Sequence, residues 1–339
     1  MRLLKSIISG VAVAAMTLTG MSSLTSCNAI YEDLDPCVSG ARLRFVYDYN
    51  MEFANAFHTQ VDCLTLHVYD ADGHFLRTLT ADRSLTSDEG WRMDIDLPPG
   101  RYRMVAWGGM QCGDASFGFL SAPESTAMTD LKVGLRTEAT ASGEGAKLHH
   151  LYYGSVEMTI PPAGTVNSYT EATVYMKKDT NDIRILLGNE SGLPTDEADF
   201  TFSITADNTV LGYDNEPLQA GAHTWLPFSK GNKPAGILPN GHEATLAFAE
   251  ISTSRLMDGH GVTLRITRNS DGYDAVKIPL VNLLLLLKSD RFSQMDSQEF
   301  LDRQSLWNIT FMLTDEGKWS ETSIIINDWI VRINTIPQL

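Results

Sequence analysis

Short segments in which apolar and polar residues alternate with a period of two recur along most of this 339-residue chain. Leu43, Phe45 and Tyr47 alternate with polar neighbours, and Leu64 and Leu66 continue the pattern after a break. Such alternation is typical of β-strands with one buried face, whereas an amphipathic helix repeats every ~3.6 residues. Because no fixed longer period accompanies these segments, a solenoid or propeller is excluded, and an all-β fold of β-sandwich domains is expected.

Turn-forming residues separate the alternating segments. Pro98-Pro99-Gly100 lies between two of them and predicts a β-hairpin, and Asp70-Ala71-Asp72-Gly73 predicts another. A helical turn is expected at Met51–Phe57, a short helix capped by Ser297 at Ser297–Ser305, and a long irregular excursion at Asn208–Gly241. The strands expected are 41–49, 61–70, 75–80, 91–97, 101–107, 131–139, 148–160, 169–178, 182–187, 199–206, 244–252, 262–268, 278–287, 307–313 and 323–335.

A Pro/Gly cluster, Pro161-Pro162-Ala163-Gly164, is the clearest candidate for a domain boundary. The apolar content of 43% is enough for two ordinary cores in a chain of this length. We therefore expect two tandem β-sandwich domains, at residues 41–163 and 164–339.

The N-terminus has the organisation of a secretory signal peptide at residues 1–26. Arg2 and Lys5 precede an uncharged, mostly apolar run from Ile7 to Gly20. That run is too short to cross a hydrocarbon core of ~30 Å as a stable helix. Small residues then precede Cys27, as expected before a cleavage site.

The stretch Leu24-Thr25-Ser26-Cys27 resembles a bacterial lipobox, which implies that Cys27 is lipidated and becomes the first mature residue. The alternative is a secreted protein whose Cys27 joins a disulfide. Residues 27–40 read as a mobile tether, and its acidic residues, Glu32, Asp33 and Asp35, resemble a surface-export signal. The protein is therefore expected on the outer membrane, held by lipid and exposed on the cell surface.

Charge excludes some partners. The net charge is −16, and removing residues 1–26 takes away two positive charges and no acid. A body this acidic repels phosphate backbones and anionic membrane surfaces, so we expect no nucleic-acid binding. Besides Cys27, the chain has Cys37, Cys63 and Cys112, and one disulfide with three possible pairings is plausible in an oxidising envelope.

No catalytic, cofactor or metal motif stands out, so we expect a protein that is not an enzyme. His149 and His150 would point to opposite faces of a strand, and Asp70–Gly73 lacks the later ligands of a calcium loop. The six tryptophans could form a sugar-binding platform, although core packing is the simpler interpretation: Trp91, Trp107, Trp225, Trp307, Trp319 and Trp329. A surface glycan-binding lipoprotein of a nutrient-uptake system is therefore the alternative function, and nothing favours a hydrolase.

Eight stretches of the sequence form a distinctive set, in this order: Ile30–Cys37, Leu43–Met51, Gln60–Leu66, Pro98–Tyr102, Ala106–Gly109, Leu151–Gly154, Glu299–Gln304 and Ile326–Trp329. Together they resemble the FimB/Mfa-type fimbrial anchor and accessory lipoproteins of Bacteroidota. The resemblance covers nearly the whole mature chain and is looser between Asn189 and Gly261.

The resemblance implies two transthyretin-like β-sandwiches and a structural, non-catalytic role. The protein would anchor or terminate a surface fimbria at the outer membrane, limit its length and support adhesion, with shaft or accessory subunits as partners through β-strand exchange. The apolar C-terminal segment is the candidate assembly strand, and the alternative is an ordinary closing strand of the second sandwich. The residues of this candidate strand are Ile324, Ile326, Trp329, Val331 and Ile333.

Overall fold

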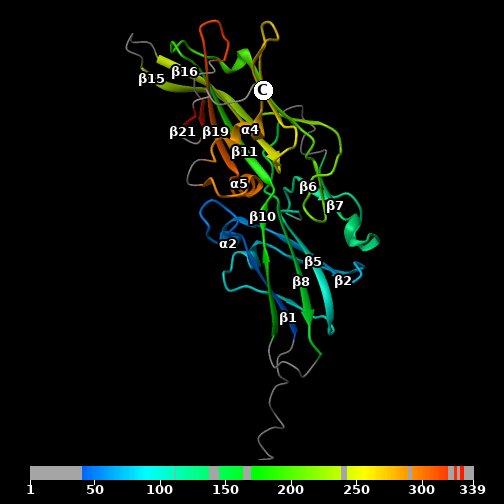
Figure 1. Ribbon diagram of the computed structural model, residues 1–339. Coiled ribbons are helices and arrows are strands. Elements are labelled where there is room, and N and C mark those ends of the chain that lie inside the picture. The colour runs from blue at the N-terminus through cyan, green and yellow to red at the C-terminus, as the bar shows by residue number, and fades with distance from the viewer. Residues whose placement is uncertain are drawn as a thin grey trace, which may run out of the picture.

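The computed structural model is an all-β molecule with only short helices in its described residues, which confirms the expected sandwich class (Figure 1). The structure describes residues 40–110, 112–136, 145–162, 169–237, 243–288, 292–319, 324–326 and 329–331. Cys27, Cys37 and Ile333 lie outside these residues. Within them, no helix has the length and apolar character needed to cross a membrane.

Two facing sheets form the N-terminal half, the lower part of Figure 1. One sheet has the order β4-β1-β9, with β4 (Met93–Ile95), β1 (Gly40–Val46) and β9 (Tyr169–Tyr175). The other has the order β10-β8-β5-β2-β3, with β10 (Lys177–Lys178), β8 (Tyr152–Ile160), β5 (Gly100–Gly108), β2 (Leu64–Asp70) and β3 (Phe75–Ala81). Leu43, Leu66 and Met104 are buried between the sheets, and removing such apolar surface from water is what holds the layers together.

Two larger sheets form the C-terminal half. The first has the order β15-β16-β11-β19-β20-β21, with β15 (Ser229–Ile237), β16 (Glu243–Ser254), β11 (Thr180–Asn189), β19 (Leu306–Leu313), β20 (Ile324–Ile326) and β21 (Trp329–Val331). The second has the order β14-β12-β17-β18, with β14 (His223–Trp225), β12 (Phe200–Ala206), β17 (Thr263–Arg268) and β18 (Asp274–Pro279). Their shared core contains Ile185, Phe202 and Ile309.

A small sheet joins the two halves. It has the order β13-β7-β6, with β13 (Val210–Gly212), β7 (Lys132–Leu135) and β6 (Phe117–Phe119). Strands β6 and β7 precede β8 in the chain, whereas β13 comes from the C-terminal half. Val133 of β7 and Trp107 of β5 belong to the same buried cluster as Trp307. One apolar core therefore continues from the outer face of β5 into the C-terminal half.

The hairpin predicted at Pro98-Pro99-Gly100 is wrong. Strand β4 pairs with β1 in one sheet, whereas β5 pairs with β2 and β8 in the other. The Pro-Pro-Gly segment therefore crosses from one layer to the next. Met93 and Tyr102 face the same core from opposite sheets, so the alternation identified both strands correctly but could not identify their partners.

The sheets also change at a different point from the predicted domain boundary. After Pro161-Pro162-Ala163-Gly164, β9 still pairs in parallel with β1, and β10 pairs with β8. The chain enters the C-terminal sheets only at Asp179–Thr180, where β11 begins. A Pro/Gly cluster marks a loop, but it does not show which sheet the following strand joins.

The apolar run Ile278–Leu287 was expected to be a buried strand, and that prediction is wrong. Strand β18 ends at Pro279, and Leu280–Leu285 forms helix α4. Leucine is a good helix former, and proline is tolerated at a helix start because its missing N–H needs no partner there. A run of buried leucines has no polar residues to reveal its period, so strand and helix could not be distinguished.

Smaller differences concern two short helices and the last part of the chain. Helix α5 (Ser297–Arg303) is present, but its cap is Asp296, whose carboxylate accepts from the backbone N–H groups of Gln298 and Glu299. The expected helical turn at Met51–Phe57 is instead α2 (Phe57–Gln60). The excursion at Asn208–Gly241 contains β13, β14 and β15. The single strand predicted at 323–335 is wrong, because β20 and β21 are antiparallel to each other.

Candidate functional site: an open strand edge beside a groove

Strand β8 has one edge that is only partly paired. Its inner edge pairs with β5 along its whole length, from Tyr152 to Ile160. Its outer edge pairs with β10 only at Tyr152 and Tyr153. In the described residues no strand continues this pairing from Ser155 onward, so backbone N–H and C=O groups on that side are open to a further strand.

The pairing stops at Gly154 because another segment crosses there. A Cβ atom on Gly154 would lie 2.8 Å from the carbonyl oxygen of Tyr175 and 2.7 Å from both Val174 Cγ1 and Met176 Sδ. This is the point at which the chain leaves β9 in one sheet and enters β10 in the other. Glycine therefore permits a close crossing of the two segments at this point.

Replacing Gly154 by alanine should lower the free energy of unfolding by about 1–3 kcal/mol, the usual cost of overpacking. The methyl group would push against main chain at Tyr175, which has little room to move. Urea denaturation of the purified chain measures the change. Gly113→Ala is the matched control, because a Cβ there has no heavy atom within 4 Å. Equal stability of the two variants would contradict the close crossing at Gly154.

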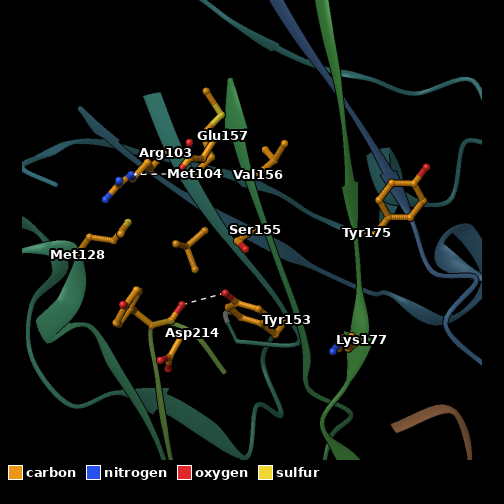
Figure 2. A pocket seen from close by; sticks show the side chains of 12 residues that line it. Arg103, Met104, Met128, Tyr153, Ser155, Val156, Glu157, Tyr175, Lys177 and Asp214 are labelled. Carbon is orange, nitrogen blue, oxygen red and sulfur yellow. Dashed lines mark hydrogen bonds and ion pairs between the residues drawn. The ribbon is translucent and has the colours of Figure 1, made fainter. Parts of the chain in front are cut away.

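A groove of about 650 Å³ runs beside this open edge (Figure 2). Its floor comes from β5 and β8, with Val105 and Ser155, and its rim carries tyrosines and charged side chains. Arg103 and Glu157 form an ion pair of 3.2 Å on adjacent strands of the floor. Tyr175 on β9 lines the groove and is 62% exposed. The groove therefore combines apolar and polar contacts with a free backbone edge.

A loop from the C-terminal half forms the opposite wall. Tyr213 and Asp214 line the groove, and the backbone oxygen of Tyr213 accepts a 2.9 Å hydrogen bond from the hydroxyl of Tyr153 (Figure 2). Burial raises the pKa of Tyr153, so its hydroxyl keeps the proton that it donates. The wall is thus fixed to the floor by a bond between the two halves of the molecule.

Other long edges carry register irregularities that β8 lacks, whereas β8 is contacted by β9 of the facing sheet. The register of β15 shifts between Pro234 and Gly236, and Asn232 on that strand bonds to Asp196. Edge strand β3 has a register irregularity opposite Val68 and Tyr69 and is contacted by helix α3 (Arg83–Thr86) and the 3-10 helix η1 (Pro123–Ser125). Bulges, prolines and covering segments are common ways to prevent edge-to-edge pairing. β8 pairs with β5 without any register shift and has no proline before Pro161.

A buried polar cluster also connects the two halves of the molecule. Arg255, at the end of β16, donates two hydrogen bonds of 2.9 and 2.8 Å to the carboxylate of Asp302 on α5. A third N–H donates to the backbone oxygen of Asn215. Arg255 and Asp302 are buried. Although burial opposes it, the hydrogen bond to Asp302 and the nearby charges of Asp179 and Asp302 raise the pKa of Arg255.

Helix α5 also contacts the N-terminal half through Arg303. The guanidinium of Arg303 lies 4.1 Å from the ring centre of Tyr49 and 4.6 Å from that of Phe53. Arg303 also donates 3.1 Å to the backbone oxygen of Asp48. Together, Asp302 and Arg303 connect β16, α5 and the loop after β1. The motifs Leu43–Met51 and Glu299–Gln304, which carried the family resemblance, therefore meet at the junction of the halves.

Other predicted site residues are not brought into one site. His149 lies 3.2 Å from Asp114, whereas His150 lies 3.6 Å from Asp182, so the two imidazoles face different carboxylates. The Asp70 carboxylate accepts from the backbone N–H groups of Asp72 and His74, as expected for a plain turn. Asp70, Asp72 and His74 can approach one another closely enough to hold an ion, but both Asp72 and His74 are exposed.

Most described tryptophans belong to the core. Trp107, Trp225 and Trp307 are at most 3% exposed, and Trp91 and Trp319 are partly buried. The indole N–H of Trp307 donates to Asn181, and that of Trp225 donates to Asn208. The core interpretation is confirmed for the three buried rings, and tyrosines rather than tryptophans surround the groove.

Two of the four cysteines are bonded to each other. Cys63 and Cys112 form a disulfide between the start of β2 and the loop after β5.

The C-terminal segment lies at one end of the six-stranded sheet. Ile324 and Ile326 lie in β20, which pairs with β19, and Trp329 and Val331 lie in β21 at the sheet edge. Sequence reasoning missed the open edge of β8 and the Arg255 cluster, because strand order and long-range ion pairs leave no local signal.

Comparisons with known proteins find one family model and several similar solved structures. The family model described as fimbrillin-A associated anchor proteins Mfa1 and Mfa2 matches residues 32–335. A candidate adhesin structure from Bacteroides thetaiotaomicron is 45% identical, with 89% of this chain and 100% of that chain covered and a TM-score of 0.83. A candidate polysaccharide-binding protein from the same species is 30% identical, with 88% and 99% covered and a TM-score of 0.74.

The fimbrial anchor protein Mfa2 from Porphyromonas gingivalis is more distant. It is 16% identical, with 87% of this chain and 99% of that chain covered and a TM-score of 0.65, which shows a shared fold. A search of curated proteins finds no match. Because the family model covers most of the chain, the chain belongs to the family of fimbrillin-A associated anchor proteins.

Proposed function

We propose that this protein is a lipid-anchored, non-catalytic subunit that holds a surface fimbria at the outer membrane, terminates it there and limits its length, and so supports adhesion. The family match over residues 32–335 is the observation that carries the proposal. The open edge of β8 supports it, because an assembly protein needs a place where another subunit can pair.

Membrane attachment would come from Cys27. Each buried CH₂ of an acyl chain contributes about 0.8 kcal/mol, so several chains on one cysteine hold a protein to a bilayer almost permanently. The strongly acidic body would gain nothing from an anionic membrane surface, so the lipid would provide the attachment.

The partner would be a fimbrial shaft or accessory subunit, joined by strand exchange along β8. A strand added to an open edge gains affinity from main-chain hydrogen bonds and specificity from pockets for alternate side chains. Between Ser155 and Ile160, the edge offers that backbone, and the groove lies on the outer face beside it. The C-terminal segment that contains Ile324 and Ile326 is a second candidate for the exchanged strand. It would first have to separate from β19, with which it pairs.

Cys27→Ala should release fimbriae from the cell. A crosslinked pull-down of surface filaments from intact cells should recover the wild-type protein with a fimbrial shaft, whereas cells carrying the variant should shed filaments into the medium. Recovery of the wild-type protein only with outer-membrane transport proteins would overturn the fimbrial proposal.

A photo-crosslinking residue tests the docking edge separately. Placed at exposed Thr159 on β8, it should capture a fimbrial subunit, whereas the same residue at exposed Leu76 on edge strand β3 should not. Equal capture at both positions, or capture at Leu76 alone, would contradict docking along β8.

Glycan binding is the second candidate function. Two observations favour it: the groove has Tyr175 and Tyr213 at its rim, and a 30% identical relative is a candidate polysaccharide-binding protein. Affinity electrophoresis in gels containing polysaccharide would then retard the protein, and Tyr175→Ala would abolish the retardation. Unchanged migration in all gels would remove this candidate.

A further inference from the structure

Asp179 is the residue through which the chain passes from the N-terminal sheets into the C-terminal ones. It follows β10 directly and precedes β11. Its backbone N–H donates a 2.8 Å hydrogen bond to the carbonyl of Leu151, and its side chain is fully buried. A carboxyl group in such a place needs a partner for each oxygen or a proton.

Two side-chain oxygen atoms of this cluster lack partners. Asn215, which is 2% exposed, donates from Nδ2 to Oδ1 of Asp179 over 2.8 Å. The other oxygen of Asp179, Oδ2, and the side-chain oxygen of Asn215 accept no hydrogen bond from the described residues. An unsatisfied buried acceptor destabilises the fold, because its hydrogen bonds to water have been lost. A proton on Oδ2 of Asp179 would turn that atom into a donor, and the side-chain oxygen of Asn215 is the unpartnered acceptor of the same bonded pair.

Arg255 does not meet this need. Two of its donors bind Asp302 and a third binds the backbone oxygen of Asn215, and its nearest approach to Asp179 is 3.9 Å. Asp302 already balances that positive charge. Other charged or titratable groups of the described residues also face the cluster. They are Lys177 of β10, 3.5 Å from Asp302, Glu216, 3.8 Å from Arg255, and the tyrosines Tyr47, Tyr49 and Tyr153.

We propose that Asp179 is protonated in the folded protein and donates from Oδ2 to the side-chain oxygen of Asn215. The carboxylic acid of Asp179 and the amide of Asn215 then form a ring closed by two hydrogen bonds, so that every side-chain oxygen of the pair takes part in a hydrogen bond. No other reactant is needed, since the proton comes from water and returns to it when the pair opens.

Burial supports this assignment by raising the pKa of Asp179 to about 7 against the opposing influence of Arg255. Because the folded pKa exceeds the unfolded value of 3.8, the pair stabilises the fold fully at acid pH. That contribution is lost as the pH rises through about 7, which is opposite to the behaviour of an ion-paired aspartate.

The pair also positions the groove wall. Asn215 has a left-handed backbone with φ of 69°, and Tyr213 and Asp214 immediately before it line the groove. Opening the pair would free this loop on one side while Tyr153 still holds Tyr213. If the proposed docking along β8 is correct, on which this consequence alone rests, partner binding weakens above pH 7.

Asp179→Asn tests the protonated pair, because an amide at position 179 can make the same two hydrogen bonds without a proton. Urea denaturation of the full chain is compared from pH 5 to pH 7. Relative to the variant, the unfolding constant of the wild type should rise by up to tenfold per pH unit, and by about 50-fold in total because half of Asp179 is still protonated at pH 7. Parallel pH profiles of wild type and variant would overturn the proposal.

Asp182→Asn is the matched control, three positions further along the chain in β11. Burial acts to raise the pKa of Asp182, but the nearby imidazole of His150 and a hydrogen bond from Ser252 bring it below its usual value, so this variant should lose stability at pH 7. A readout that needs no variant is the infrared spectrum of the wild type labelled with ¹³C-aspartate. A neutral carboxylic acid band at pH 6 that vanishes above pH 8 is expected, and its absence at pH 6 would show an ionised Asp179.

These outcomes are separable from the proposed function. Stability and infrared data report only the proton, whereas crosslinking at Thr159 reports only docking. A protonated pair with no capture at Thr159 would leave the pair intact and reject docking along β8, and capture with an ionised Asp179 would do the reverse.

Discussion

Arg255→Met should lower the free energy of unfolding by about 3–5 kcal/mol, the usual cost of removing one partner from a buried ion pair. Asp302 would stay buried with its carboxylate deprived of two hydrogen bonds, and Asn215 would lose a donor to its backbone oxygen. Urea denaturation of the purified chain at pH 7 measures the effect.

Arg268→Met provides the matched control. Arg268 also donates two hydrogen bonds to one carboxylate, that of Asp271, at 3.0 and 2.7 Å. That pair lies at the surface, where water screens the charges and a lost partner is replaced by solvent. The urea midpoint of this variant should barely move. A similar loss in both variants would show that burial of the Arg255 pair is not what makes it important.

Replacing Cys63 and Cys112 together by alanine should cost about 2–4 kcal/mol of folding free energy. The disulfide joins residues 49 positions apart, so its loss frees a long loop in the unfolded chain. It also ties the start of β2 to the loop after β5. Thermal unfolding under non-reducing conditions measures the change.

Cys37→Ala distinguishes this disulfide from the other pairings that the cysteine count permits. Cys37 lies outside the described residues, and the Cys63–Cys112 pairing predicts that its replacement leaves the melting temperature unchanged. If Cys37→Ala destabilised the chain as much as the double variant, a different pairing would exist in the mature protein.

Strands could be predicted wherever apolar and polar residues alternate along the chain, even in β2, whose polar residues Thr65 and His67 are themselves buried. The segments around Leu43, Leu66 and Met104 show this alternation, and all three lie in strands of the N-terminal sandwich. Local chemistry also predicted the turn at Asp70–Gly73 and the presence of α5. These features depend on interactions within a few residues, which a single sequence contains.

Partners distant in the chain could not be predicted. Nothing near Pro98 shows that β4 and β5 join different sheets, and nothing near Ser155 shows that its strand ends a sheet. The Arg255–Asp302 pair spans 47 positions, and 42 acidic residues offer too many candidate partners for any one to be singled out. The run after Ile278 failed for another reason, since uniformly apolar segments have no polar face to reveal a period.

The position of β1 has a mechanical consequence. This strand begins at Gly40, and it lies between β4 and β9, paired with β9 over seven consecutive residues. The C-terminal half lies at the far end of the molecule (Figure 1). A pull on Gly40 away from that half therefore acts along β1, at right angles to its ladder. Hydrogen bonds loaded in this direction share the force and must break together, whereas a strand peeled from an edge loses them one at a time.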